Sequence, residues 1–170
     1  MFVRTILVII FSFSSLPCFG QALWKDSMYG MSEAQVLKVN PAAVKPIKSS
    51  RLGDGAQQLL EVSGIEVVKT KFTAKFYFKE DTLRQVMLGM DDGPSAGQAE
   101  LIWDELFTIL SSKYGKELNR KNQAGVLRIK NSTWVFGKTN ISLLLMTVAD
   151  GQPILNVVYQ QRIAIDAGEL

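Results

Sequence analysis

Apolar and polar residues alternate between Ile65 and Phe78, and this alternation is the clearest pattern in the chain. A period of two places alternate side chains on opposite faces of a strand, so it predicts a long strand with one face turned to the core. A turn at 79–81 leads to a returning strand at 82–90, and a short strand at 57–62 comes before a turn or bulge at Ser63-Gly64. These segments predict an antiparallel meander.

Two helices are predicted, each opened by a Ser-x-x-Gln capping box. The first box, at residues 32–35, begins a helix that Asn40-Pro41 ends, because the residue before a proline avoids helical geometry. The second box, at 95–98, begins a longer helix whose apolar residues share one broad face, and Gly115 ends it as a left-handed cap.

The last part of the chain predicts more strands. They are expected at 126–130, 133–136, 140–147 and 154–160. An amphipathic helix must cover its apolar side, and each strand has one apolar face, so the expected fold is α+β. It consists of an antiparallel sheet with two helices packed on one face, in the order α-β-β-β-α-β-β-β, with room for one further strand.

The first 22 residues predict a secretory signal peptide. An apolar run follows Arg4, and small or turn-prone residues lead to Ala22. The run is shorter than the roughly 20 apolar residues that a membrane-spanning helix needs, so the chain is not expected to span a membrane after processing. Cys18 suggests lipidation, but Pro17 stands where lipoprotein signals have a small residue, and this question stays open. Residues 23–170 are then one α+β domain.

Composition narrows the possible functions. The chain has no histidine, and its one cysteine, Cys18, lies in the predicted signal peptide. The usual general base, the usual zinc ligand and an internal disulfide are therefore missing from the processed chain, and we expect a protein that is not an enzyme and has no cofactor. Arg4 is the one charged residue of the segment removed, so the net charge falls from +3 to +2, which gives no reason to expect nucleic-acid binding.

One candidate binding surface stands out in the sequence. Cations and an aromatic residue share the outward positions of the long strand and its start: Lys69, Lys71, Lys75, Tyr77 and Lys79. Residues on one face of a strand stand roughly 6.5 to 7 Å apart, so this row could meet an acidic protein surface or another anionic surface. The alternative is a solvated sheet face whose lysines protect an edge from pairing.

Other polar groups were considered as sites. A second basic run consists of Lys113, Lys116, Arg120, Lys121, Arg128 and Lys130, and cations at a helix C-terminus explain its beginning. The acidic pairs Asp91-Asp92 and Asp104-Glu105 are better explained by turn chemistry and a solvated helix face than by glycoside chemistry. Ser112 and Lys113 are neighbours on the helix and do not face each other, so a serine with a lysine base is not formed there.

Several landmarks resemble those of known proteins. Gly30-Met31-Ser32 followed by Val36 resembles the G-M-[ST]-x-x-x-V helix start of small secreted bacterial envelope proteins, mostly uncharacterised, and is distantly similar to the BamE/SmpA family of outer-membrane assembly lipoproteins. That family usually continues into Leu-Gly-x-Pro, where this chain has Lys38-Val39-Asn40-Pro41. The resemblance implies a periplasmic or secreted protein of the bacterial envelope that binds or scaffolds, and it implies no catalytic residue.

Three functions follow from these observations. The first is a non-enzymatic binding or scaffolding protein that recognises a protein partner or an anionic surface in the envelope. The second is an immunity-type inhibitor of a toxin in the periplasm. The third is a hydrolase with a Ser/Lys or carboxylate site. The identity of the partner and the oligomeric state are open at this point.

Overall fold

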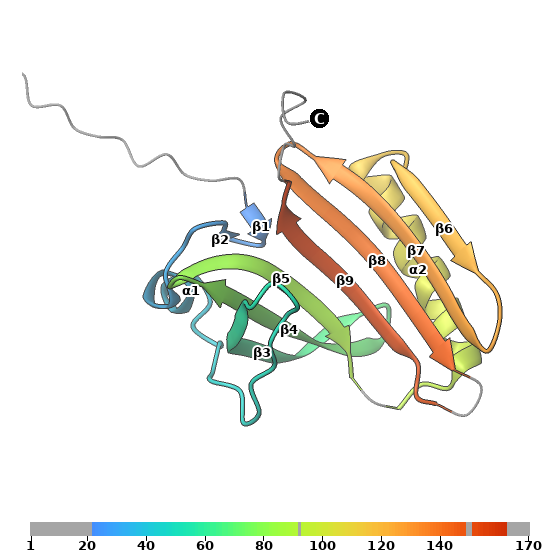
Figure 1. The fold of residues 1–170 in the computed structure, drawn as a ribbon, viewed down its shortest axis with the longest axis horizontal. Coiled ribbons are helices and arrows are strands. Elements are labelled where there is room, and N and C mark those ends of the chain that lie inside the picture. The colour runs from blue at the N-terminus through green and yellow to red at the C-terminus, as the bar shows by residue number, and fades with distance from the viewer. Residues whose placement is uncertain (1–21, 92, 149–150, 163–170) are drawn as a thin grey trace, which may run out of the picture.

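Strands dominate the fold. The computed structural model of the chain describes residues 22–91, 93–148 and 151–162, and Figure 1 shows its elements. In chain order they are β1 (Ala22–Trp24), β2 (Ser27–Met28), α1 (Glu33–Val39), β3 (Gln57–Val67), β4 (Thr70–Lys79), β5 (Thr82–Met90), α2 (Ala96–Tyr114), β6 (Asn119–Gln123), β7 (Leu127–Phe136), β8 (Thr139–Val148) and β9 (Ile154–Gln161).

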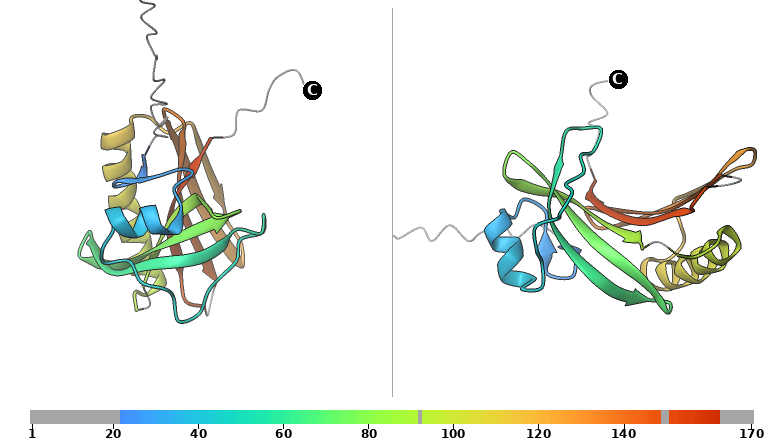
Figure 2. Two further views of the ribbon diagram at one scale, coloured as in Figure 1. Left: turned by 90° about the vertical axis from the view of Figure 1, so that its left-hand side faces the viewer. Right: turned by 90° about the horizontal axis from the view of Figure 1, so that it is seen from below.

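Seven of the strands form one antiparallel sheet in the order β3-β4-β5-β9-β8-β7-β6, and β1 pairs with β2. The last strands of the two halves, β5 and β9, lie side by side in the middle, where Gln85 is opposite Gln160. The order is therefore nearly symmetrical about the β5–β9 pair, and a capped helix precedes each half. Figure 2 shows the two halves at a steep angle to one another, with α2 on one side of the β7–β9 half.

The predicted α+β class is wrong, because the described residues form a mostly β fold with nine strands and two helices. The prediction lacked β1, β2 and β6, and it interrupted two long strands. β6 reads NRKNQ and is exposed along its whole length, so it shows no alternation that would mark a strand. It is an edge strand, and β7 is the strand with which it pairs.

The two interrupted strands have a physical explanation. Residues 63–64 form a bulge inside β3, and the hairpin turn comes later, at Val68 and Lys69, both with positive φ. Turns with positive φ usually contain glycine or asparagine, and valine rarely adopts that conformation. This turn therefore could not be recognised from its residues. Residues 131–132 look like a polar turn but continue β7, where Ser132 is fully buried.

Both predicted helix starts are confirmed. The side chain of Ser32 accepts from the backbone of Gln35, and Ser95 does the same from Gln98; each glutamine side chain bonds back to the serine N–H. Gly115 follows the last residue of α2 with φ at 84°. The caps satisfy N–H groups that have no partner inside the helix, which is why the boundaries could be predicted.

The Gly-Met-Ser segment has a structural role. The Gly30 N–H donates to the carbonyl of Leu83 at 2.9 Å, and the Leu83 N–H donates to the carbonyl of Met31 at 2.7 Å. Gly30 has φ at 84°, which other residues adopt at a cost. The motif therefore fastens the start of α1 to the start of β5 by backbone bonds.

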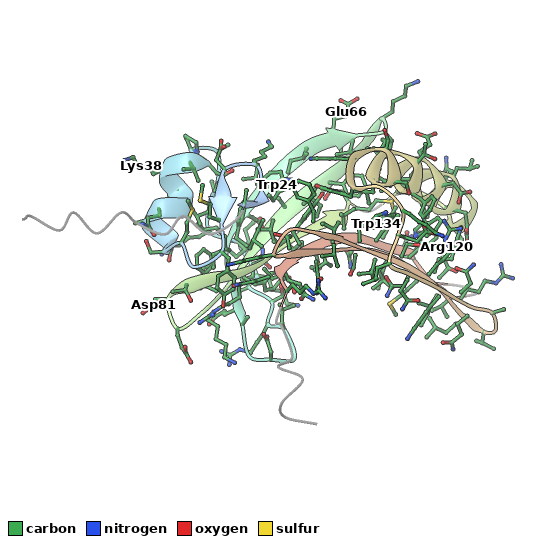
Figure 3. The ribbon with its side chains drawn as sticks, turned by 90° about the horizontal axis from the view of Figure 1, so that it is seen from above. Trp24, Lys38, Glu66, Asp81, Arg120 and Trp134 are labelled. Carbon is green, nitrogen blue, oxygen red and sulfur yellow. The ribbon has the colours of Figure 1, made fainter. Side chains whose placement is uncertain are left out.

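Most buried apolar residues of the described part of the chain form one core, on the α2 side of the sheet. Trp24 meets Phe76 edge to face at 5.8 Å, and Trp134, on β7, packs against Phe107 of α2 at 5.5 Å between ring centroids (Figure 3). The Trp134 indole N–H donates to the Gly115 carbonyl at 3.1 Å and joins the end of α2 to the sheet. The predicted signal peptide lies, apart from Ala22, outside the described residues.

Candidate functional site

The predicted lysine row is only partly assembled. Phe72, Phe76 and the other apolar residues of β4 face the core, and Lys71, Lys75 and Lys79 lie on the opposite side, which we call the open face of the sheet. Lys69 is in the β3–β4 turn with φ at 59°, so it does not continue the row.

Tyr77 is not available for binding, since it is 1% exposed. Its hydroxyl group lies 2.9 Å from that of Ser50, in the segment that precedes β3. Burial raises the pKa of Tyr77, and the Ser50 bond opposes that shift. The same segment bridges to the edge of β3 at Val44–Glu61 and Arg51–Gln57. The sequence predicted an aromatic residue among the cations, but this segment covers it.

Carboxylates lie opposite two of the lysines. Glu66 pairs in register with Lys71, and Glu61 with Lys75, both across the β3–β4 ladder. Within the described part of the chain, neither lysine makes an ion pair shorter than 4 Å. The two ammonium groups are therefore free to meet an external carboxylate, although the β3 edge of the row is mixed in charge.

The second basic run is divided between both sides of the sheet. Lys130 lies on the α2 side, where its ammonium donates to Glu100 at 2.7 Å and Asp104 at 3.3 Å and sits 4.0 Å from the Trp103 ring centroid. Arg120 also faces α2, with its guanidinium 3.9 Å from the ring centroid of Phe107. These contacts hold α2 against β6 and β7 and do not form a basic patch.

No catalytic arrangement emerges from the polar groups considered above. Asp91 accepts a hydrogen bond from Thr73 at 2.8 Å, and Asp92 lies outside the described residues. Ser132 shares a face of β7 with Lys130, but Ser132 is fully buried and the Lys130 ammonium is engaged by two carboxylates. Among the described residues, no group of three or more acidic, histidine or cysteine side chains is placed to hold a metal ion.

The register reveals a surface that the sequence analysis missed. On the open face, the paired positions of β5 from Gln85 onward and those of β9, β8 and β7 carry no Asp, Glu, Lys or Arg, and we call this surface the neutral face. Arg84, in the bulge at the start of β5, lies at its border and lines a hollow with Gln85 and Gln160. The neutral face consists of Gln85, Met87, Gly89, Ile154, Asn156, Val158, Gln160, Asn140, Ser142, Leu144, Met146, Val148, Leu127, Ile129, Asn131, Thr133 and Val135.

Large apolar side chains of the neutral face reach solvent. Ile154 is 50% exposed and Val148 46%, and Met87, Leu144 and Met146 are half-buried. The side-chain oxygen of Asn131 is buried and has no hydrogen-bond partner within the described residues. A solvated sheet face normally carries charged residues, so an uncharged one of this extent calls for an explanation.

A signal for this surface exists in the sequence. Between Thr139 and Gln161 the one charged residue is Asp150. Each strand taken alone shows ordinary alternation, with inward Ile141, Leu143 and Leu145 setting the pattern. The extent of the uncharged area becomes visible once the pairing places four strands side by side.

A hollow of about 630 Å³ lies on the open face between the lysine row and the neutral face. Gly89 and Asn156 are opposite each other in it, and Lys75, Met87 and Ile154 contribute to its lining. A Cβ atom at position 89 would lie 3.2 Å from the Asn156 side-chain oxygen, so glycine keeps this space open. A second hollow, of about 540 Å³, lies between the β3–β4 turn and the start of α2.

Comparison with known proteins gives no further guide. No family model matches the chain, and no solved structure matches it. The resemblance to secreted envelope proteins therefore stays a prediction. None of the helices described is long and apolar enough to cross a membrane.

Proposed function

We propose that this chain is a non-enzymatic binding protein that docks a protein partner on the neutral face. The observation that supports the proposal is the lack of charged residues on the neutral face, where four adjacent strands have partly exposed aliphatic side chains. Charged residues are depleted from the centres of protein–protein interfaces, because each buried charge must lose its water. A surface without them can be covered at little electrostatic cost.

The apolar residues supply the favourable term. Each Å² of apolar surface removed from water contributes about 25 cal/mol, and Met87, Leu144, Met146 and Ile154 are spread over three of the strands. Methionine side chains adapt to the shape of a partner, since they are unbranched and polarisable. The amides of Asn140, Asn156 and Gln160 can pair with polar groups of the partner.

The compartment is part of the proposal. The predicted signal peptide and the resemblance to small secreted envelope proteins support export to the periplasm or beyond, and a protein partner in the bacterial envelope. The contacts of α2 and the N-terminal motif are structural, so the open face remains for recognition.

Site-specific photo-crosslinking tests the proposal. Benzoylphenylalanine is placed at Ser142, in the centre of the neutral face, and separately at Ser112, which is exposed on α2. Cells that naturally produce the chain are irradiated, and adducts are separated and identified by mass spectrometry. We expect one major protein adduct from position 142 and none from position 112. Equal labelling patterns at the two positions would show that the neutral face has no special role.

A further inference from the structure

The neutral face is too small to form a stable interface alone. Strands lie about 4.8 Å apart and residues about 3.3 Å apart along a strand, so four strands over the positions from Asn140 to Met146 cover about 440 Å². A stable interface of standard size takes about 800 Å² from each partner. A partner that covers the neutral face must therefore also cover the strands on either side of it.

Lysines lie on both flanks of the neutral face, and on the β4 side the carboxylates of Glu61 and Glu66 stand behind them on β3. On the β5 side lies β4, with Lys71 and Lys75 outward and without an ion-pair partner within 4 Å in the described part of the chain. On the β7 side lies β6, where Lys121 is opposite Asn131 and therefore points to the same side. Asn119 and Gln123, its neighbours on that face, are uncharged.

A second copy of this chain does not match these flanks. If two copies packed their open faces together about a two-fold axis along the strands, the β4 lysines of one would approach Lys121 of the other. With the axis across the strands, the lysine rows would meet each other. Either arrangement brings lysines of the two copies towards each other, which opposes association.

We infer that the partner presents an apolar centre flanked by Asp or Glu side chains, which lie over the lysines of β4 and over Lys121 of β6. This inference rests on the proposed function and defines the chemistry of its partner. The hollow above Gly89 adds one detail. Its lining combines apolar Met87 and Ile154 with the Asn156 amide, the Lys75 ammonium and the carboxylates of Glu61 and Asp91. It receives a large aromatic side chain of the partner.

Charge reversal tests the flanks. Benzoylphenylalanine at Ser142 is combined with Lys71→Glu and Lys75→Glu, and the matched control is Lys38→Glu with Lys48→Glu, two exposed lysines on α1 and in the segment before β3. We expect the adduct yield to fall roughly tenfold with the β4 pair and to stay within twofold in the control. An unchanged yield with the β4 pair would overturn the inference.

The partner's own composition gives an independent result. The inference expects the crosslinked peptide to have carboxylates close to the labelled residue, and the yield to drop between 50 and 300 mM salt. An adduct with another copy of this chain, or a partner whose contact region is basic, would overturn it. So would sedimentation of the purified chain with vesicles that contain anionic phospholipid, because the flanks would then serve a lipid surface.

Filling the hollow above Gly89 tests whether it receives an aromatic side chain of the partner. Gly89→Leu should lower the adduct yield at least fivefold, whereas Gly97→Leu, an exposed glycine on α2 with open space around its Cβ position, should leave it unchanged. Thermal melting checks that both variants are folded. If Gly89→Leu does not fold, Gly89→Ala replaces it, with a smaller expected loss of adduct yield. An unaltered adduct yield in a folded Gly89 variant would show that the hollow does not receive a side chain of the partner.

The failures of the two proposals are distinguishable. If position 142 gives no adduct at all in the unsubstituted chain, the proposed function fails. If the adduct forms but ignores charge reversal and salt, the protein-binding function stands and the acidic partner is wrong.

Discussion

Trp134 and Trp103 are both buried, but only the indole N–H of Trp134 has a hydrogen-bond partner in the described part of the chain. Replacing each by phenylalanine, one at a time, should therefore lower the free energy of unfolding by different amounts. Trp134 is fully buried and donates to the Gly115 carbonyl at 3.1 Å. Trp103 is 3% exposed, and its N–H has no partner among the described residues. The two substitutions remove the same atoms, so the difference between them reports the hydrogen bond of Trp134, the unpaired N–H of Trp103 and the contact of Trp103 with Lys130.

The expected magnitudes follow from these contacts. Each substitution leaves a small cavity worth about 1–2 kcal/mol of the free energy of unfolding. Trp134→Phe also loses a hydrogen bond worth about 1 kcal/mol, for a total of about 2–3 kcal/mol. Trp103→Phe removes a buried donor without a partner, which returns about 1 kcal/mol or more, and weakens the contact with Lys130 by roughly 0.5 kcal/mol. Its net cost should be about 0.5–1.5 kcal/mol.

Urea unfolding followed by far-ultraviolet circular dichroism measures both values, because this signal does not depend on the tryptophans being replaced. Trp134→Phe should shift the midpoint to lower urea by at least twice the shift of Trp103→Phe, at an unchanged slope. A larger loss for Trp103→Phe would refute the reasoning, since its N–H would then have an unrecognised partner.

Three further results are expected. Burial, with a smaller effect of Tyr114, raises the pKa of Tyr159 above the ordinary value of 10. The unfolded chain therefore releases this proton first, and the stability present below pH 10 should fall as the pH rises above it. Tyr159→Phe should make that fall shallower in urea titrations at about pH 9 to 11. Ser95→Ala should cost about 1 kcal/mol by urea unfolding through loss of the α2 cap, and an effect below 0.3 kcal/mol would count against the capping geometry. Gly30→Ala should lower the melting temperature through strain at a positive φ, while Gly97→Ala, in the first turn of α2, should not.

Local patterns predicted the parts of the fold that depend on neighbouring residues. The capping boxes at 32–35 and 95–98 and the alternation in β4 each involve residues a few positions apart, and the structure has all three. The turn at Val68-Lys69 could not be predicted, because the strands on either side impose a conformation that valine does not favour. β6 could not be predicted either, since the pairing with β7 creates it.

The candidate site shows the same division. Alternation correctly placed Lys71 and Lys75 on one face, but it could not show that Ser50 covers Tyr77, because the two are far apart in the sequence. The neutral face depends on the pairing of β5 with β9, which connects the two halves of the chain. An uncharged stretch in the sequence is a signal for such a surface, but its position on one side of the sheet requires the register.

Met87 and Met146 lie on the neutral face and allow the central proposal to be tested in the unaltered protein. Oxidation by hydrogen peroxide is followed by mass spectrometry in the purified chain and in intact cells that produce it. Met31, which precedes α1 and is not part of the neutral face, is the internal reference. A partner on the neutral face should slow sulfoxide formation at Met87 and Met146 in cells, relative to Met31, by several fold. Equal relative rates in the two samples would contradict the proposal that this face binds a protein.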